Sequence, residues 1–127
     1  MAFSIDRIDH LALTVANIPA TCDFYSEVLG MEVVAEGGQT ALTFGEQKIN
    51  LQQRGHEFEP KAAHPMPGSA DVCLITESPM AEVVEYLKAL RVHIELGPME
   101  RNGAMGKMQS VYIRDPDRNL VEISNYE

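Results

Sequence analysis

Residues 8–15 read IDHLALTV, and the alternation of apolar and polar positions in this stretch predicts a β-strand. Leu11, Leu13 and Val15 form one apolar face of the strand, whereas His10 belongs to the opposite face. Successive side chains of a strand point to opposite sides, so a helix that covers the apolar face leaves His10 uncovered. The side that carries His10 is therefore the side on which chemistry is expected.

A helix and three further strands are expected after this strand. Asn17 is a suitable N-cap for the helix, and Gly30 is a suitable residue at which the helix ends. Short apolar runs separated by glycine-containing turns then predict strands at residues 31–36, 40–44 and 48–53. The first half of the chain thus has the element order βαβββ.

The same order of elements recurs in the second half of the chain. Ser78 is expected to cap a second helix, with Pro79 in its first position. Caps, an aromatic residue and two apolar anchors recur at a constant offset of 61 positions, which indicates an internal repeat. The expected strands lie at residues 71–76, near 92–96, at 110–114 and at 120–125. The matched pairs are Asn17 with Ser78, Tyr25 with Tyr86, Leu29 with Leu90, and Val33 with Ile94.

The repeat is broken once, by an insertion in the second half. The offset grows to 72 between Asn50 and Glu122, which are corresponding residues of the last strand in each half. The added residues belong to GPMERNGAMGK, residues 97–107. The three glycines of this segment predict a mobile loop that closes over a bound ligand.

These patterns predict an α+β fold made of two tandem βαβββ modules within a single domain that spans residues 1–127. The first module covers about residues 5–54, the linker residues 55–69, and the second module about residues 70–126. Each sheet would bury one face against its own helix. The two sheets, side by side, are expected to form a curved mixed sheet with a concave cleft, which is a common kind of ligand site.

The composition excludes several classes of function. Hydrophobic residues make up 45% of the 127 residues, which is enough for a core without disulfide bonds, and Cys22 and Cys73 are expected to be small core residues. The net charge of −9 argues against nucleic acids and anionic membranes as partners. No apolar run approaches the ~20 residues that span a bilayer, and the first residues do not resemble a secretion signal, so a cytoplasmic location is expected.

Strand parity brings polar side chains from four strands to one side of the predicted sheets. On each strand, the apolar positions that face the helix alternate with polar positions that face the cleft. The internal repeat pairs His10 with Asp71, and Asn50 with Glu122. The cleft-side residues are His10 on the first strand, Asn50 and Gln52 on the fourth, Asp71 and Cys73 on the fifth, and Glu122 and Ser124 on the last.

An imidazole and two carboxylates are suitable ligands for a divalent metal ion, and we expect His10, Asp71 and Glu122 to supply them. Three protein ligands leave positions open for water and for a small chelating substrate. Glu122 is also a candidate for proton transfer. The other polar residues of the cleft, expected to bind substrate, are Asn50, Gln52, Cys73 and Ser124.

Several of these residues have simpler alternative roles. A single histidine on a strand is most often a polar surface residue, and Glu122 could face solvent on an edge strand. Asp71 could form an Asx turn at the start of its strand. His64 could reach the cleft as an acid or base, or could be a surface histidine of the linker. The carboxylates in Asp115–Asn119 are expected to stabilise a tight turn.

Three stretches of the chain resemble the vicinal-oxygen-chelate superfamily, and the resemblance covers nearly the whole chain. They are IDHLALTV at residues 8–15, FYSEVLGMEV at 24–33 and YIRDPDRNLVEI at 112–123. That superfamily includes glyoxalase I, extradiol dioxygenases, fosfomycin-resistance proteins and bleomycin-binding proteins. HPMPGSADVCLIT at 64–76 and RDPDRNLVEISNY at 114–126 resemble, more closely, small glyoxalase-domain-containing and virulence-associated glyoxalase-like proteins.

The resemblance implies a divalent metal ion (nickel, zinc, manganese or iron), with His10 at the family's first-strand ligand position and Glu122 at its last-strand position. It also implies a homodimer, in which His10 of one chain faces Asp71 and Glu122 of the other. Three positions depart from the family pattern. Asn50 stands where bacterial glyoxalase I has Glu, Asp71 stands where His is common, and Arg118 stands where Gly is common.

The leading interpretation is a metal-dependent lyase or isomerase of the glyoxalase type that acts on a small oxygenated compound. An iron-dependent ring-cleaving dioxygenase is the second interpretation, although Asp71 leaves its usual two-histidine site incomplete. A metal-free antibiotic-binding resistance protein is the third. Such a protein needs an apolar, often aromatic cleft, and the absence of Trp with only four Phe counts modestly against it.

Overall fold

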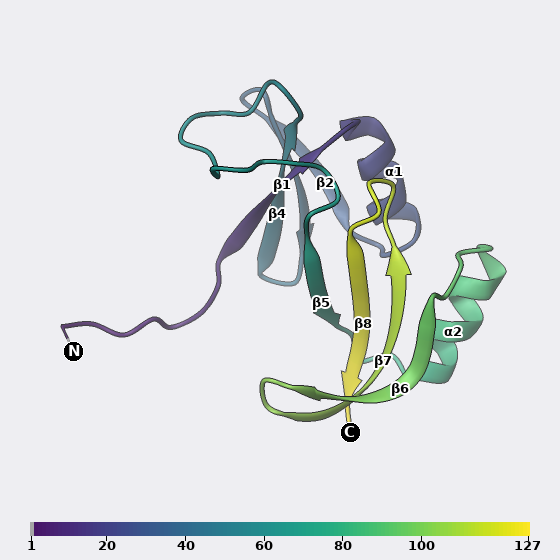
Figure 1. Ribbon diagram of the computed structural model, residues 1–127. Coiled ribbons are helices and arrows are strands. Elements are labelled where there is room, and N and C mark those ends of the chain that lie inside the picture. Colours follow the sequence, from purple (N-terminus) through teal and green to yellow (C-terminus); the bar gives the residue numbers. More distant parts are fainter. Residues whose placement is uncertain (1) are drawn as a thin grey trace. The chain divides into compact units, whose positions relative to one another are not determined.

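The computed structural model describes residues 2–127, which divide into two compact units between Pro67 and Gly68. Each unit, called a module below, contains one four-stranded mixed sheet and one helix (Figure 1). The predicted α+β class and the βαβββ order of each module are confirmed. Neither helix among residues 2–127 is long and apolar enough to cross a membrane.

In the first module, the first and last strands along the chain pair with each other in parallel, and the remaining strand pairs are antiparallel. The sheet order is β1-β4-β3-β2. Such a parallel pair needs a long connection, which here contains the helix and two strands. The elements are β1 (His10–Val15), α1 (Ile18–Glu27), β2 (Glu32–Glu36), β3 (Gln39–Phe44) and β4 (Gln47–Gln53).

Helix α1 begins where the sequence predicts. The Asn17 side chain accepts a hydrogen bond from the backbone N–H of Ala20 at 2.9 Å, which satisfies one of the free donors of the first turn. The helix packs on β2, β3 and β4, and Tyr25 is fully buried at this contact. The strand residues of this core, Leu13, Val15, Leu42, Ile49 and Leu51, are all at most 6% exposed.

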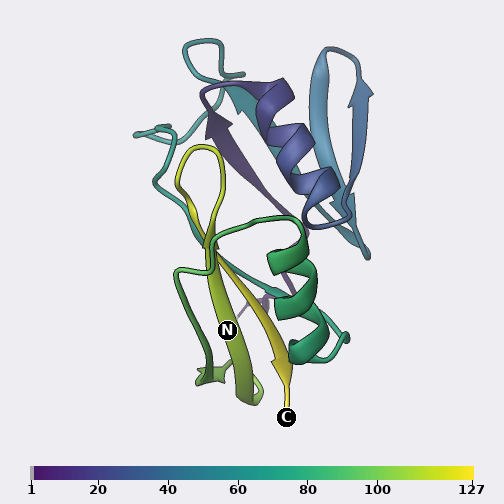
Figure 2. The same ribbon diagram turned by 90° about the vertical axis from the view of Figure 1, so that its right-hand side faces the viewer.

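The second module repeats this topology with the sheet order β5-β8-β7-β6. Figure 2 shows that each helix lies against one face of its own sheet. The side chains of α2 and the sheet that form the second core are Leu87, Val111, Ile113, Val121 and Ile123. The elements are β5 (Asp71–Ile75), α2 (Met80–Ala89), β6 (Leu96–Gly103), β7 (Gly106–Arg114) and β8 (Leu120–Tyr126).

The offset between corresponding residues of the two modules is one residue larger for the helices than for the strands β1 and β5. The predicted cap Ser78 is wrong, because α2 begins at Met80 with Pro79 as its N-cap and without a side-chain cap hydrogen bond. The helices therefore correspond at an offset of 62, and the strands β1 and β5 at 61. In consequence Leu87, and not Tyr86, occupies the place of Tyr25.

The segment predicted as a mobile loop, residues 97–107, is instead a β-hairpin. Strand β6 covers most of it and pairs with β7 from Met99 opposite Ser110 to Gly103 opposite Gly106. The strand expected near residues 92–96 is accordingly wrong, since β6 begins only at Leu96. The glycines that suggested mobility serve the ends of the hairpin: Gly103 leaves no room for a Cβ beside Met108, and Gly106 has a φ of 144°.

The turn between β7 and β8 has the structural role that the sequence predicts. Asp115 is 5% exposed, and one of its carboxylate oxygens accepts hydrogen bonds from the backbone N–H groups of Asp117 and Asn119, both at 2.9 Å. The Asn119 side chain donates to the other carboxylate oxygen at 2.8 Å and accepts from the N–H of Ala70, also at 2.8 Å. These bonds tie the turn to the residue that precedes β5.

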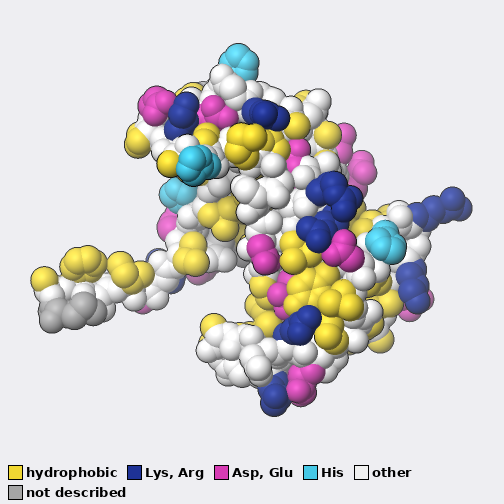
Figure 3. All heavy atoms as spheres, viewed as in Figure 1, with side chains coloured by type: hydrophobic (Ala, Val, Ile, Leu, Met, Phe, Trp, Pro, Cys, Tyr) yellow, Lys and Arg dark blue, Asp and Glu magenta, His cyan; other side chains and the backbone are white. Residues whose placement is uncertain are grey.

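The residues before β1 form an extended arm that leaves the first module (Figure 1). Its apolar side chains are exposed in the space-filling view (Figure 3). Phe3 is 72% exposed, Ile5 79% and Ile8 67%, so this arm contributes nothing to the core of the chain that carries it.

Candidate functional site

Each sheet has a distal face, defined here as the face opposite the module's own helix, and the predicted polar residues lie on these faces. In the first module, His10 is opposite Lys48 and Ala12 is opposite Asn50, whereas the apolar Leu11–Ile49 and Leu13–Leu51 pairs alternate with them. The alternation follows the period of two of a β-strand.

His10 is held by its neighbour in sequence. One ring nitrogen, Nδ1, lies 2.8 Å from a carboxylate oxygen of Asp9, and the side chain of His10 is 45% exposed. This hydrogen bond lowers the pKa of Asp9 below its usual value. A histidine that is fixed through Nδ1 by a carboxylate presents Nε2 outward, which is the usual arrangement of a metal-binding imidazole.

The other predicted residues of the first module differ in how accessible they are. Asn50 is half-buried, opposite Ala12 and Ala41. The side-chain oxygen of Gln52 accepts a hydrogen bond from the N–H of Phe58 at 2.6 Å, so this residue anchors the start of the linker. His64 is exposed, and its role as an acid or base stays a prediction.

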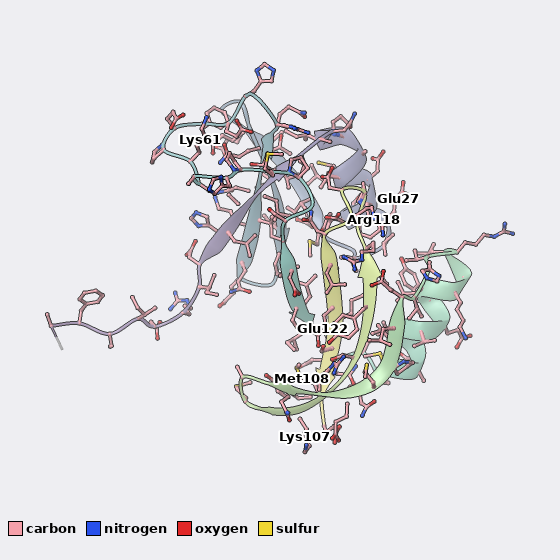
Figure 4. The ribbon with its side chains drawn as sticks, viewed as in Figure 1. Glu27, Lys61, Lys107, Met108, Arg118 and Glu122 are labelled. Carbon is pink, nitrogen blue, oxygen red and sulfur yellow. The ribbon has the colours of Figure 1, made fainter. Side chains whose placement is uncertain are left out.

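The distal face of the second module carries Glu122 at its centre (Figure 4). Cys73 of β5 lies opposite Glu122 on one side, and Tyr112 of β7 lies opposite it on the other. One carboxylate oxygen, Oε2, accepts a hydrogen bond from the Ser124 hydroxyl at 3.2 Å. Asp71 is exposed and lies opposite Leu120. It is two residues before Cys73 on β5, and therefore on the same face as Glu122.

A chain of polar side chains continues from Glu122 below the surface. The Ser124 oxygen lies 2.6 Å from the Ser110 oxygen and 3.3 Å from the sulfur of Cys73. Both serines are fully buried. The predicted core role of Cys73 is wrong, because this residue is exposed on the distal face. Its sulfur is nevertheless part-buried, and this partial burial is the main reason why the pKa of Cys73 is raised. The Ser124 hydrogen bond lowers the pKa of Cys73, and the charges of Glu122 and Asp71 raise it.

The predicted ligands belong to different modules, since His10 is in the first, and Asp71 and Glu122 are in the second. Within residues 2–127, no group of three histidine, cysteine, aspartate or glutamate side chains is assembled as a metal site. The three-ligand set therefore stays a prediction.

Three residues of the second distal face were missed by sequence reasoning. Ser110 and Tyr112 could have been found by applying strand parity to residues 110–114. Arg101 lay in the segment interpreted as a loop. In the structure, its Nε donates to the Tyr112 hydroxyl at 2.9 Å, and its guanidinium lies 5.5 Å from the centre of the Tyr112 ring.

Residues 7–123 match the family described as the Glyoxalase/Bleomycin resistance protein/Dioxygenase superfamily. The chain is also similar to Virulence protein STM3117 of Salmonella typhimurium, with 55% identity over 96% of this chain and 85% of that protein. A crystal structure of that virulence protein has a TM-score of 0.97 and 54% identity, and covers 98% of this chain and 100% of the other.

Two further relatives extend the comparison. Glyoxalase domain-containing protein RDO1 of Mycosarcoma maydis is 46% identical over 98% of this chain and 70% of its own length. The crystal structure of a lactoylglutathione lyase from Agrobacterium tumefaciens has a TM-score of 0.72 and 26% identity, and covers 95% of this chain and 94% of the other.

Proposed function

This chain belongs to the Glyoxalase/Bleomycin resistance protein/Dioxygenase superfamily, and we propose on that premise that it is a metal-dependent lyase or isomerase acting on a small oxygenated substrate. His10 and Glu122 are the proposed ligands of a divalent metal ion, with Asp71 as a third. When bound, the ion would act as a Lewis acid on an oxygen of the substrate.

The observation that supports this proposal most is the state of the Glu122 carboxylate. It lies on the distal face with Oε2 held by Ser124, so that Oε1 can bind a cation. His10 is held in the same manner through Nδ1 by Asp9. Metal-binding residues are commonly oriented by such second hydrogen bonds, and an imidazole with carboxylates is a donor set that suits zinc, nickel, manganese and iron.

The neighbouring side chains have proposed roles in binding and proton transfer. Glu122 would accept a proton from a carbon next to the polarised oxygen and return it at the adjacent carbon. Asn50 has an amide that can bind a substrate oxygen, and the thiol of Cys73 lies beside Glu122 on the same face. The similarity to a lactoylglutathione lyase favours this type of chemistry over ring cleavage.

Metal titration of single variants tests the proposal. His10→Ala and Glu122→Ala should each weaken the binding of nickel, manganese, zinc or ferrous ions by at least about 100-fold, because the loss of a residue that only orients a ligand already costs about 10–100-fold. Neither substitution removes core volume, so both metal-free proteins should fold. Only His10→Ala should melt at the wild-type temperature, because Glu122→Ala also removes the acceptor of the buried Ser124 hydroxyl. His56→Ala and Glu85→Ala are matched controls, since both remove an exposed side chain of the same type.

Calorimetry with the four metal ions decides between the interpretations. Unchanged affinity in both the His10 and Glu122 variants would contradict the metal site and favour a metal-free binding protein. Cleavage of a catechol ring by the protein loaded with ferrous iron would favour the dioxygenase interpretation instead. Loss of metal in both variants and retention in both controls, together with no ring cleavage, would support the lyase or isomerase.

We also propose that the protein is a homodimer, as the family resemblance implies. The exposed apolar arm before β1 is consistent with burial in an assembly. Light scattering at micromolar concentration should give about twice the chain mass of 14.1 kDa. A monomer that binds metal with full affinity would contradict a site shared between chains.

A further inference from the structure

We infer that Ser110 and Ser124, with the thiol of Cys73, position the Glu122 carboxylate through a hydrogen-bond chain that runs in one direction; this role rests on the proposed function of Glu122. The serines are positioning residues, because they act through Glu122 and are themselves fully buried. The chain lies entirely within the second module and connects three strands, β5, β7 and β8.

The direction of the chain follows from counting protons. A carboxylate only accepts hydrogen bonds, so the Ser124 hydroxyl must donate its single proton to Oε2 of Glu122. The Ser124 oxygen can then only accept from its other neighbours. Ser110, at 2.6 Å, therefore donates to Ser124, and the Cys73 thiol, at 3.3 Å, points its proton to the same oxygen.

Burial makes this arrangement rigid. Neither serine oxygen has access to water, so each hydroxyl proton must be used within the chain, because an unused buried donor is costly. If Ser124 donated to Ser110 instead, the Ser124 oxygen and the Glu122 carboxylate would face each other as two acceptors, and the Ser110 proton would lose its partner. The carboxylate is thus the acceptor that allows every donor in the chain to be satisfied, and the bond from Ser124 to Oε2 holds its side chain in one rotamer.

The first module has no such chain at the corresponding positions. Ala12 stands in the place of Cys73, and Gln52, whose oxygen is occupied by Phe58, stands in the place of Ser124. Asn50, which corresponds to Glu122, therefore lacks the buried hydroxyl that would orient it. The positioning device belongs to the carboxylate side alone.

The decisive variant is the double substitution Ser110→Ala/Ser124→Ala. Ser124→Ala alone leaves the Ser110 hydroxyl buried without its acceptor, which lowers stability for a reason unrelated to Glu122. Removing both hydroxyls leaves no such orphan, so the double variant should melt close to the wild-type temperature. Ser26→Ala on α1, which removes a half-buried hydroxyl that donates to the backbone oxygen of Asp23, is the control.

Two measurements on these proteins separate positioning from plain structural support. Crystal structures without metal should show Glu122 in one rotamer in the wild type and in Ser26→Ala, but in several rotamers in the double variant. Nickel affinity should fall about 10–100-fold in the double variant, the usual loss when a residue that orients a metal ligand is removed. A single wild-type rotamer of Glu122 in the double variant would overturn the inference.

A neutron structure of the wild-type protein tests the inference without any variant. Deuterium on Ser124 should point to Glu122, and deuterium on Ser110 should point to Ser124. The opposite direction at either bond would overturn the chain. If the wild type binds no nickel, the proposed function fails, while the rotamers and the deuterium positions still decide whether the serines position Glu122.

Discussion

The two modules share one topology but differ in how their distal faces are built. In the first module, β2 is exposed along its whole length, and the only fully buried residue of β3 is Leu42. In the second, the hairpin strands β6 and β7 are longer, and β7 buries residues on both of its faces. Those on the distal face are Met108 and Ser110, and those facing α2 are Val111 and Ile113.

This difference shows that the helix side and the distal side of a module follow separate rules. The helix side is fixed by apolar periodicity in both modules, although α2 is shifted by one residue relative to α1 and has no side-chain cap. The distal side depends on the length and pairing of one hairpin, which in the second module lets two serines be buried beside a carboxylate. Divergence between the modules is concentrated where the chemistry is proposed.

The largest expected difference in stability between the modules concerns two tyrosines that the sequence repeat aligns. Tyr25 is fully buried, whereas Tyr86 is 49% exposed. Tyr25→Ala should therefore lower the free energy of unfolding by about 3–5 kcal/mol, and Tyr86→Ala by less than about 1 kcal/mol. Urea denaturation of the two variants measures both values. Equal losses would mean that the helices do correspond at an offset of 61.

A smaller difference is expected between the turns that precede the last strand of each module. Asp115→Ala removes a buried acceptor of three hydrogen bonds and should cost about 3 kcal/mol. The turn between β3 and β4 contains the exposed Glu46, and Glu46→Ala should change stability by no more than about 0.5 kcal/mol. Thermal unfolding followed by circular dichroism compares them. Comparable melting temperatures would contradict the assigned role of Asp115.

The helix ends should respond in opposite directions. Gly30 follows α1 with a φ of 68°, and Arg91 follows α2 with a φ of 60°, a conformation that costs less for glycine. Gly30→Ala should destabilise by about 1 kcal/mol, and its new Cβ would meet no atom within 4 Å. Arg91→Gly should stabilise by about 0.5–1 kcal/mol. Denaturant midpoints report the sign, and a loss of stability in Arg91→Gly would show that the arginine side chain has another role.

The smallest expected effect is the pH dependence of a surface ion pair in the second module. Two nitrogens of Arg114 donate to the two oxygens of Glu95 at 3.0 and 2.9 Å, and this hydrogen bonding lowers the pKa of Glu95. Since the folded pKa is the lower one, the pair stabilises the fold fully above the usual value of 4.5 and loses that contribution as the pH falls through the folded pKa. Stability of the wild type and Glu95→Gln should differ at pH 7 and converge as the pH falls through the folded pKa of Glu95, and added salt should reduce the difference. A difference that persists below the folded pKa would point to lost packing.

Much of this fold follows from short-range patterns in the sequence. The alternation in residues 8–15, the Asn17 cap and the Asp115 turn depend on neighbours a few positions away, and all three were predicted. The hairpin at residues 97–107 was missed because its glycines are typical of loops. What makes this segment a strand is its pairing with β7, the next strand along the chain.

The sequence by itself determined the module order, the parity of the strands and the residues that can carry chemistry, because each depends on periodicity and on the type of side chain. Tertiary structure decided that Leu87 replaces Tyr86 in the core, that Cys73 is exposed, and that a buried hydroxyl of β7 reaches Glu122 through Ser124. The last two features arise from the pairing of β8 with β5 and with β7. The chain of hydrogen bonds that ends at the part-buried Glu122 carboxylate depends on register at the level of single residues, and sequence patterns fix register only where one face is apolar.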